Sequence, residues 1–293
     1  MSGAGPRTPV ALGLVVAGLL CQELGAAIAV LVFPEVGPLG MVMLRLVFSA
    51  LILCAIARPR LRGHSRAAWR AVAGFGTVLA CMNGTFYLAL ERLDLGVTVT
   101  IEVLGPLVLS VVLARRASAW LWAGLALAGV VALGAGGWEK LDPIGVGFAL
   151  LAAVSWAGYI RGSAAVGRAF AGIDGLALAM AVGAVIALPF GVIDAGSALL
   201  HPGLVGLGAA VAVLSSTIPY AAELAALRRL SESAFGILMS LGPATAATAG
   251  FLLLGQHLRW LEVIGIALVV IASAGAVWMS ARRSRMPVTE PVA

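Results

Sequence analysis

Charged residues are scarce in this chain, making up 11% of its 293 positions, whereas hydrophobic residues make up 61%. A soluble domain of this size needs much more polar surface to cover its outside. The composition therefore excludes a water-soluble globular protein and indicates that the chain is dissolved in lipid.

Cysteine is also rare, and the three cysteines, Cys21, Cys54 and Cys81, all fall within long apolar segments. This placement excludes an extracellular disulfide framework. The three histidines are spread over separate loops or segment ends, without a cysteine or carboxylate cluster at metal-ligand spacing. The glycines lie inside apolar segments, so no phosphate-binding loop is expected either. These absences predict no enzyme activity, no metal and no cofactor.

Long apolar stretches are what the sequence has instead. A helix that crosses a bilayer needs about 20 mainly apolar residues, and such stretches recur along nearly the whole chain. They are continuous and do not alternate, which favours helices over a β-barrel. The sequence predicts ten spans: Val10–Phe33, Leu39–Ala57, Ala68–Leu90, Leu95–Leu113, Ala119–Gly137, Ile144–Ile160, Ile173–Ile193, Gly203–Leu227, Ser233–Leu254 and Trp260–Ser280.

Basic residues are distributed very unevenly between the two sides of this ten-span arrangement. With the N-terminus inside, only Arg92, Lys140 and Arg259 fall on the outer side, and Arg45 falls within a span. The remaining basic residues of the 19 all fall on the cytoplasmic side. Such a bias is typical of cytoplasmic loops, so both termini are expected in the cytoplasm. The same bias explains the net charge of +6 without a nucleic-acid partner. The cytoplasmic set is Arg7, Arg58, Arg60, Arg62, Arg66, Arg70, Arg115, Arg116, Arg161, Arg168, Arg228, Arg229, Arg282, Arg283 and Arg285.

The chain also repeats itself. The letters "ALERL" from Ala89 recur as "ALRRL" from Ala226, and "LGP" from Leu104 recurs from Leu241, always at an offset of 137 residues. Because each copy has five spans, the acidic loop around Arg92 in the first copy lies outside, and the basic loop around Arg229 in the second copy lies inside. This pattern predicts two inverted-topology repeats of five helices in an all-helical integral membrane protein, at residues 8–138 and 142–283. Residues 284–293, with two prolines and no apolar run, are expected to be a disordered cytoplasmic tail.

Ionisable residues inside spans are costly to place in lipid and are candidates for function. Glu23, Arg45, Glu102 and Glu223 lie within the first, second, fourth and eighth spans. Each also has a structural interpretation. Arg45 could snorkel or brace a glutamate, and Glu223 could lie at the interface. Glu23 and Glu102 could be protonated carboxyls that hydrogen-bond a neighbouring helix.

Polar residues at helical spacing add to these candidates for substrate binding or proton coupling. Asn83 and Tyr87 share one face of the third span, and Tyr220 shares a face with Glu223 on the eighth. Trp156, on the sixth span, is expected to be an interfacial anchor more than a substrate wall.

Three prolines fall inside the expected spans. Pro106, Pro219 and Pro243 each remove a backbone donor and permit a kink. Such kinks serve gating in some helices and are static bends in others.

Three long motifs resemble one family. They are "FPEVGPLGMVMLRL" around Arg45, "CMNGTFYLALERLDLGVTVTIEVLGPL" from Cys81 and "AVLSSTIPYAAELAALRRLSESAFGILMSLGP" from Ala212. They resemble the EamA-type branch of the drug/metabolite transporter superfamily, and within it the bacterial threonine/homoserine exporters. The resemblance covers about residues 10–283. It implies a protein of the bacterial cytoplasmic membrane that exports amino acids or similar small amphiphilic metabolites, driven by the proton gradient.

The resemblance also bears on individual residues. It implies a binding role at motif positions, which are Asn83, Tyr87, Glu102, Tyr220 and Glu223. The chain departs from the family at two places. Glu23 stands where relatives often have an uncharged polar residue, and "LGQ", ending at Gln256, stands where many have "LGE".

The favoured hypothesis is a secondary active exporter that works by proton antiport and alternating access. Its partners would be a small solute, protons and the lipid bilayer, in a monomer or a homodimer. One alternative is an exporter of drugs or other metabolites. Another is a membrane-embedded enzyme or a structural subunit.

Overall fold

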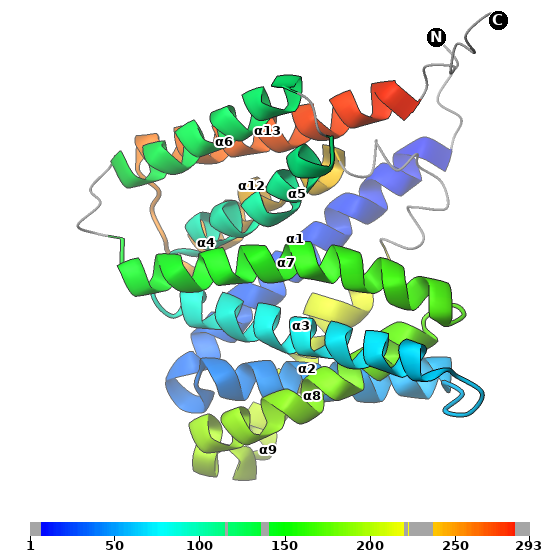
Figure 1. Ribbon diagram of the computed structural model, residues 1–293. Helices are drawn as coiled ribbons and strands as arrows, with labels where there is room; N and C mark the ends of the chain where they lie inside the picture. The colour runs from blue at the N-terminus through cyan, green and yellow to red at the C-terminus, as the bar shows by residue number, and fades with distance from the viewer. Residues whose placement is uncertain (1–6, 115–116, 136–140, 220–221, 223–236, 285–293) are drawn as a thin grey trace, which may run out of the picture.

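The computed structural model describes residues 7–114, 117–135, 141–219, 222 and 237–284, and every regular element within these ranges is helical (Figure 1). The elements are α1 (Arg7–Val36), α2 (Pro38–Ala57), α3 (Arg66–Leu90), α4 (Leu95–Glu102), α5 (Leu104–Ala114), α6 (Ala117–Ala135), α7 (Pro143–Ala169), α8 (Asp174–Ala195), η2 (Gly196–Leu200), α9 (Pro202–Ala212), the π-helical η3 (Val213–Thr217), α12 (Gly242–Leu254) and α13 (Trp260–Ser284).

The prediction of an all-helical membrane protein is confirmed, whereas the number of ten full spans is not. Eight described helical stretches are long and apolar enough to cross a membrane. Shorter apolar helices, Ala119–Leu133 and Pro202–Thr217, occupy the positions of the fifth and eighth expected spans. The second of these positions continues into residues outside the described part of the chain.

The sixth expected span is longer than predicted. Helix α7 continues past Ile160 to Ala169, so Arg161 and Arg168 lie on the helix and not in a loop. The residues between them include no proline, and alanine and arginine favour helix. An arginine near the end of a span can therefore extend a helix beyond the apolar stretch that hydropathy detects.

The fourth expected span is two helices. Between α4 and α5, Val103 breaks the helix, because Pro106 has no N–H to donate to the carbonyl of Glu102. Ser240 and Leu241 break the helix before α12 in the same way, three and two residues before Pro243. The two breaks are separated by the 137-residue offset found in the sequence.

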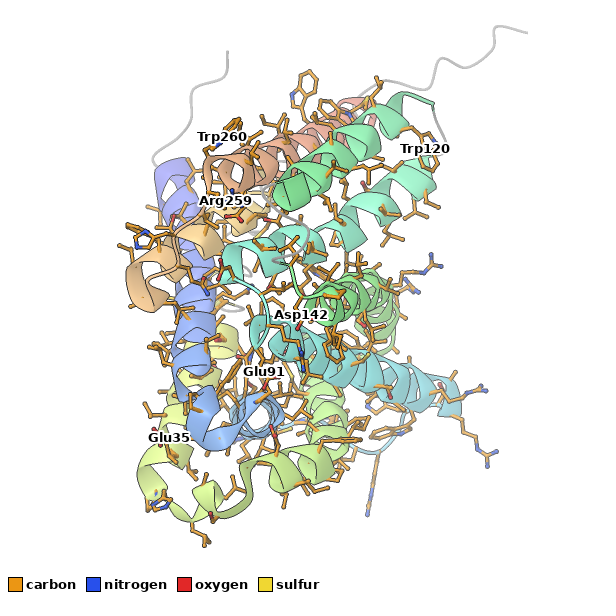
Figure 2. All side chains as sticks on the ribbon, turned by 90° about the vertical axis from the view of Figure 1, so that its left-hand side faces the viewer. Glu35, Glu91, Trp120, Asp142, Arg259 and Trp260 are labelled. Carbon is orange, nitrogen blue, oxygen red and sulfur yellow. The ribbon has the colours of Figure 1, made fainter. Side chains whose placement is uncertain are left out.

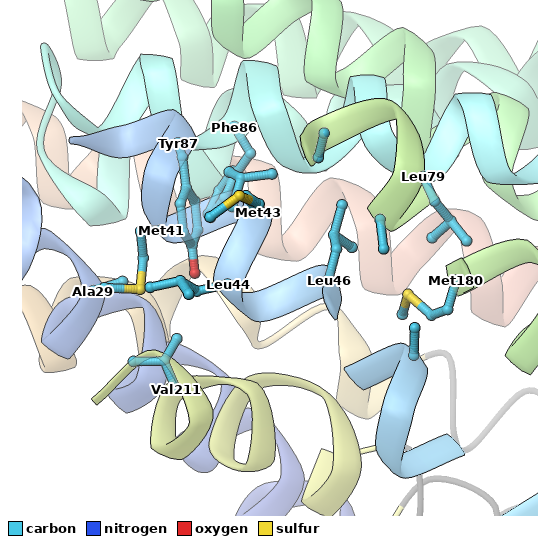
Figure 3. Packing of buried hydrophobic residues seen from close by; sticks show 14 of the residues in the cluster. Ala29, Met41, Met43, Leu44, Leu46, Leu79, Phe86, Tyr87, Met180 and Val211 are labelled. Carbon is cyan, nitrogen blue, oxygen red and sulfur yellow. The ribbon is translucent and has the colours of Figure 1, made fainter. Parts of the chain in front are cut away.

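The helices pack in two groups, one in the lower part and one in the upper part of Figure 1. In the lower part of Figure 1, α2 packs against α8, while α3 packs against α7 and α8. In the upper part α6 lies along α13. The largest apolar cluster belongs to the lower part, and Figure 3 shows Tyr87 within it, among Met41, Met43 and Leu44.

Glycine allows α6 and α13 to approach closely. A Cβ on Gly129 would come within 2.7 Å of the carbonyl oxygen of Gly265, and a Cβ on Gly265 within 2.6 Å of that of Gly129. Any side chain at either position would push the two helices apart. Small residues of this kind are typical of helix interfaces in membranes.

Polar contacts join the first half of the chain (residues 7–135) to the second half (residues 141–284) at one end of the bundle. We name it the α1–α2 end, because α1 meets α2 there; Figure 2 faces it, with Glu91 and Asp142 labelled. Arg92 donates to Asp142 at 2.8 Å, and Leu95 N donates to Gln256 Oε1 at 3.1 Å. The hydrogen bond from Arg92 lowers the pKa of the Asp142 carboxyl.

A third contact at the same end caps α2. Asp194, in the last turn of α8, accepts hydrogen bonds from Leu39 N at 2.8 Å and from Gly40 N at 3.1 Å. These N–H groups have no helical partner, and the helix dipole favours an anion beside them. Gly37 precedes the cap with φ 73°, and a Cβ there would overlap the Asp194 carboxylate.

Candidate functional site

A cavity of about 150 Å³ lies between the two halves, enclosed by α1, α2, α3, α4, α7, η3 and α12. Most of its lining is apolar or aromatic. Its polar lining residues include Gln22, Glu23, Arg45, Asn83, Glu102 and Ser215. A mostly apolar pocket with a few convergent polar groups is the usual form of a small-molecule site.

Two carboxyl groups and one guanidinium group lie in this cavity. Glu23, on α1, is 2% exposed, and Glu102 is the last residue of α4, at the helix break. Arg45, on α2, lies close enough to both carboxyls to interact with them electrostatically. Within the described residues, no ion pair shorter than 4 Å joins Arg45 to either of them. The cavity can therefore present separate positive and negative groups to a solute.

Arg45 braces an irregular segment of the second half. Its Nη2 donates to Ser215 O at 3.1 Å and its Nε to Ser216 Oγ at 3.4 Å. In a regular helix the donor to Ser215 O would be the N–H of residue 219, but residue 219 is Pro219. Arg45 supplies the missing donor. The π-helical turn η3 therefore lies just before the proline that removes a helical donor and beside the arginine that replaces it.

Tyr87 and Asn83 have different roles although they share a face of α3. Tyr87 is fully buried and does not line the cavity. Its hydroxyl accepts from Arg45 Nη1 at 3.3 Å, and its ring lies 5.7 Å from the guanidinium carbon. Asn83 does line the cavity, and its Nδ2 donates to Leu79 O at 2.8 Å. Asn83 therefore reaches the solute side, while Tyr87 positions Arg45 from behind.

The remaining candidates are distributed as follows. Pro243 lines the cavity, in the first turn of α12, whereas Pro106 in the corresponding position on α5 does not. Pro219 follows η3. Tyr220 and Glu223 lie outside the described residues.

Sequence reasoning missed several lining residues. Trp156, for which an interfacial anchor was preferred to a substrate wall, lines the cavity together with Tyr159 on α7, as the substrate-wall alternative requires. Their spacing of three places both on one helix face, which was the available signal. Gln22 was missed as well, although an amide beside a carboxylate in an apolar span is itself unusual. Among the described residues, no three His, Cys, Asp or Glu side chains lie together so as to hold a metal ion.

Apolar helices around a cavity that holds carboxyl and guanidinium groups are typical of a multi-pass membrane transport protein. Residues 143–278 match the EamA-like transporter family. The chain is 35% identical over 284 residues to the threonine/homoserine exporter RhtA of Salmonella typhimurium, which covers 94% of this chain and 95% of that protein. It is 33% identical over 290 residues to RhtA of Escherichia coli K12, covering 98% of each. The chain belongs to the EamA-like transporter family, as the sequence motifs indicated.

The fold itself has been seen before. A solved crystal structure resembles this one with a TM-score of 0.61 over 94% of this chain and 99% of that chain, at 19% identity. At that identity the likeness shows the fold alone.

Proposed function

We propose that this protein exports amino acids of the threonine/homoserine kind across the bacterial cytoplasmic membrane by proton antiport. The observation that carries the proposal is the joint presence of Glu23, Arg45 and Glu102 in one cavity between the two halves. The relatives that match over nearly the whole chain are threonine/homoserine exporters, which supports the substrate class.

The charges suit a zwitterion. The ammonium group of an amino acid binds near Glu102, and its carboxylate near Arg45 and Asn83. A carboxyl group in apolar surroundings favours its neutral form, whereas a bound cation favours the carboxylate. Proton and substrate therefore compete for the same group, which produces antiport. Tyr220 and Glu223 remain predicted members of this site.

Alternating access by an inverted repeat is part of the proposal. The helix breaks before α5 and α12 lie 137 residues apart, and α2–α8 and α6–α13 each pair the equivalent helices of the two halves. These pairings are what a pseudo-two-fold axis in the membrane plane would produce. The α1–α2 end faces outward, because the basic α2–α3 connection lies at the opposite end, where α1 begins and α13 ends (Figure 1).

The size of the cavity favours a small metabolite over a drug. Its volume of about 150 Å³ is below the roughly 300–1,000 Å³ of drug-sized sites. Resistance to toxic amino-acid analogues on overexpression would agree with this assignment, and resistance only to lipophilic cations would contradict it.

The coupling role of Glu102 can be tested in proteoliposomes with labelled threonine and an imposed pH gradient. We expect Glu102→Gln to lower gradient-driven transport by about tenfold or more, because an amide neither carries the proton nor balances the ammonium charge. Glu35→Gln is the control, since Glu35 is exposed at the end of α1. Full gradient-driven transport by Glu102→Gln would exclude Glu102 as the coupling group.

A further inference from the structure

Two cavity-lining residues, Glu23 and Ser215, carry a buried side-chain oxygen with no hydrogen-bond partner among the described residues. Ser215 Oγ lies against Gly25 of α1, where a Cβ would overlap it, which leaves Glu23 as the candidate for a solute contact. Glu23 Oε2 is inaccessible to solvent and makes no hydrogen bond to any described residue.

Gln22 lies within hydrogen-bonding reach of the Glu23 carboxyl. Arg45 and Asn83 already bond protein oxygens, as described above. Glu23 therefore offers the cavity an acceptor that the described part of the chain does not use.

A buried acceptor without a partner is costly, and native proteins rarely keep one without a reason. Glu23 lines the cavity as part of the helical face formed by Leu19, Gln22 and Ala26. Leu19 and Ala26 of this face are apolar, so a polar group of a bound solute that meets this wall of the cavity would have the unsatisfied Glu23 carboxyl as its partner.

We propose that the Glu23 carboxyl group binds the side-chain hydroxyl of the substrate and so makes the cavity selective for hydroxylated amino acids. This inference rests on the proposed function. In that function the ammonium and carboxylate groups of the solute are held by Glu102 and by Arg45 with Asn83, which leaves the side chain to contact Glu23. Threonine and homoserine, for which the relatives are named, share a side-chain hydroxyl.

A side-chain hydroxyl of the substrate fits the position beside Glu23 better than a side-chain ammonium group would. Arg45 already acts electrostatically on Glu23, so another cation there would meet the guanidinium charge. A hydroxyl is neutral and can donate to a carboxylate or accept from a carboxylic acid. The contact therefore survives a change in the protonation state of Glu23.

The cavity is small enough for one molecule to reach both carboxyls. Glu23 and Glu102 both line a space of about 150 Å³, and the charge of Glu23 acts on Glu102. A solute the size of threonine that places its ammonium at Glu102 has its side chain only a few bonds away.

The test is counterflow of labelled solutes in proteoliposomes, without a pH gradient. Threonine is compared with valine, which replaces the hydroxyl by a methyl group, and homoserine with norvaline. We expect the wild-type protein to prefer the hydroxylated member of each pair by about tenfold or more, since the analogue leaves the acceptor unsatisfied. Glu23→Leu should bring both ratios close to one. Glu23→Gln should keep the preference, because its amide still accepts and donates.

Two further variants distinguish a loss of hydroxyl selectivity from a general loss of transport. Glu102→Gln should slow threonine and valine alike and leave their ratio unchanged. Ser273→Ala removes another buried hydroxyl that has no partner in the described residues, on α13 and away from the cavity, and should change neither rate nor ratio.

The outcomes are distinguishable. Wild-type protein that moves threonine and valine equally overturns the hydroxyl subsite, with Glu23 then bound only to water, and leaves the proposed function standing. A preserved ratio in Glu23→Leu also overturns it. Wild-type protein that moves none of the four solutes contradicts the proposed function itself. Should Glu23→Leu fail to fold, Glu23→Ala removes the same acceptor and takes its place in the test.

Discussion

At the scale of single residues, Arg45 shows how an intramembrane charge becomes part of the scaffold. Its guanidinium group joins α2 to Tyr87 on α3 and to the Ser215 carbonyl, 170 positions along the chain. The carbonyl lacks a helical donor because of Pro219. The sequence indicated that Arg45 either contacts substrate or acts as a brace, and the structure shows that it braces η3 while also lining the cavity.

Replacing Arg45 by lysine tests this bracing. The lysine ammonium group keeps the positive charge. It cannot bond Ser215 O, Ser216 Oγ and the Tyr87 hydroxyl at the same time, as the planar guanidinium group does. We expect Arg45→Lys to lower threonine efflux by about tenfold or more, from the loss of charged hydrogen bonds. Tyr87→Phe, which removes one acceptor, should have a smaller effect. Wild-type efflux by Arg45→Lys would show that charge alone is sufficient.

At the scale of elements, helix breaks and close contacts both depend on single residues. Pro106 and Pro243 interrupt two spans that hydropathy describes as continuous. The breaks place Glu102 and Pro243 at helix ends, facing the cavity. Gly129 and Gly265 fix the distance between α6 and α13. Small changes at these positions should therefore alter how whole helices pack.

The α6–α13 contact gives a matched pair of substitutions on one helix. Gly129→Ala places a methyl group against the carbonyl of Gly265, and we expect it to destabilise the protein by about 1–3 kcal/mol through overpacking. Gly124→Ala, which meets nothing within 4 Å, should be neutral or stabilise by up to about 1 kcal/mol. Thermal unfolding in detergent measures both. Equal stability of the two variants would contradict the close contact.

At the scale of the whole molecule, three polar contacts hold the two halves together at the α1–α2 end. They involve Asp142 with Arg92, Gln256 with the start of α4, and Asp194 with the start of α2. All three lie on the side that we propose faces outward. In the proposed alternating access, opening the cavity to that side would separate these contacts.

The Arg92–Asp142 pair carries a prediction about pH. The hydrogen bond from Arg92 lowers the pKa of Asp142, so its stabilisation is fully present above the ordinary aspartate value of about 3.9. It is lost as the pH falls through the lower value in the folded protein. We expect Asp142→Asn to have a lower melting temperature than wild type at pH 7, with the difference shrinking below about pH 4.

The control for this experiment is Glu35→Gln at the same end of the bundle, which should leave the melting temperature unchanged at both pH values. A difference between Asp142→Asn and wild type that grows as the solution becomes more acidic would contradict the assigned direction.

The candidate site was only partly predictable. Glu23, Arg45, Asn83 and Glu102 were identifiable because polar groups in apolar spans are rare and costly. Trp156 could not be assigned from the sequence, since an aromatic residue near a span end looks the same whether it faces lipid or a cavity. Tyr87 was a predicted site residue, but it lies behind Arg45 and does not line the cavity, a position that depends on which neighbouring helix covers it.

The sequence by itself determined that the chain is a helical membrane protein, where most spans lie, which side is basic and which polar residues are buried. These properties follow from local composition, because transfer into lipid acts on each segment separately. Tertiary structure alone decided that Glu23, Arg45 and Glu102 share one cavity, that Arg45 replaces the donor missing at Pro219, and that the contacts of Asp142, Asp194 and Gln256 with the first half lie together at the α1–α2 end. Those facts depend on how helices distant in the chain pack together, which no local pattern encodes.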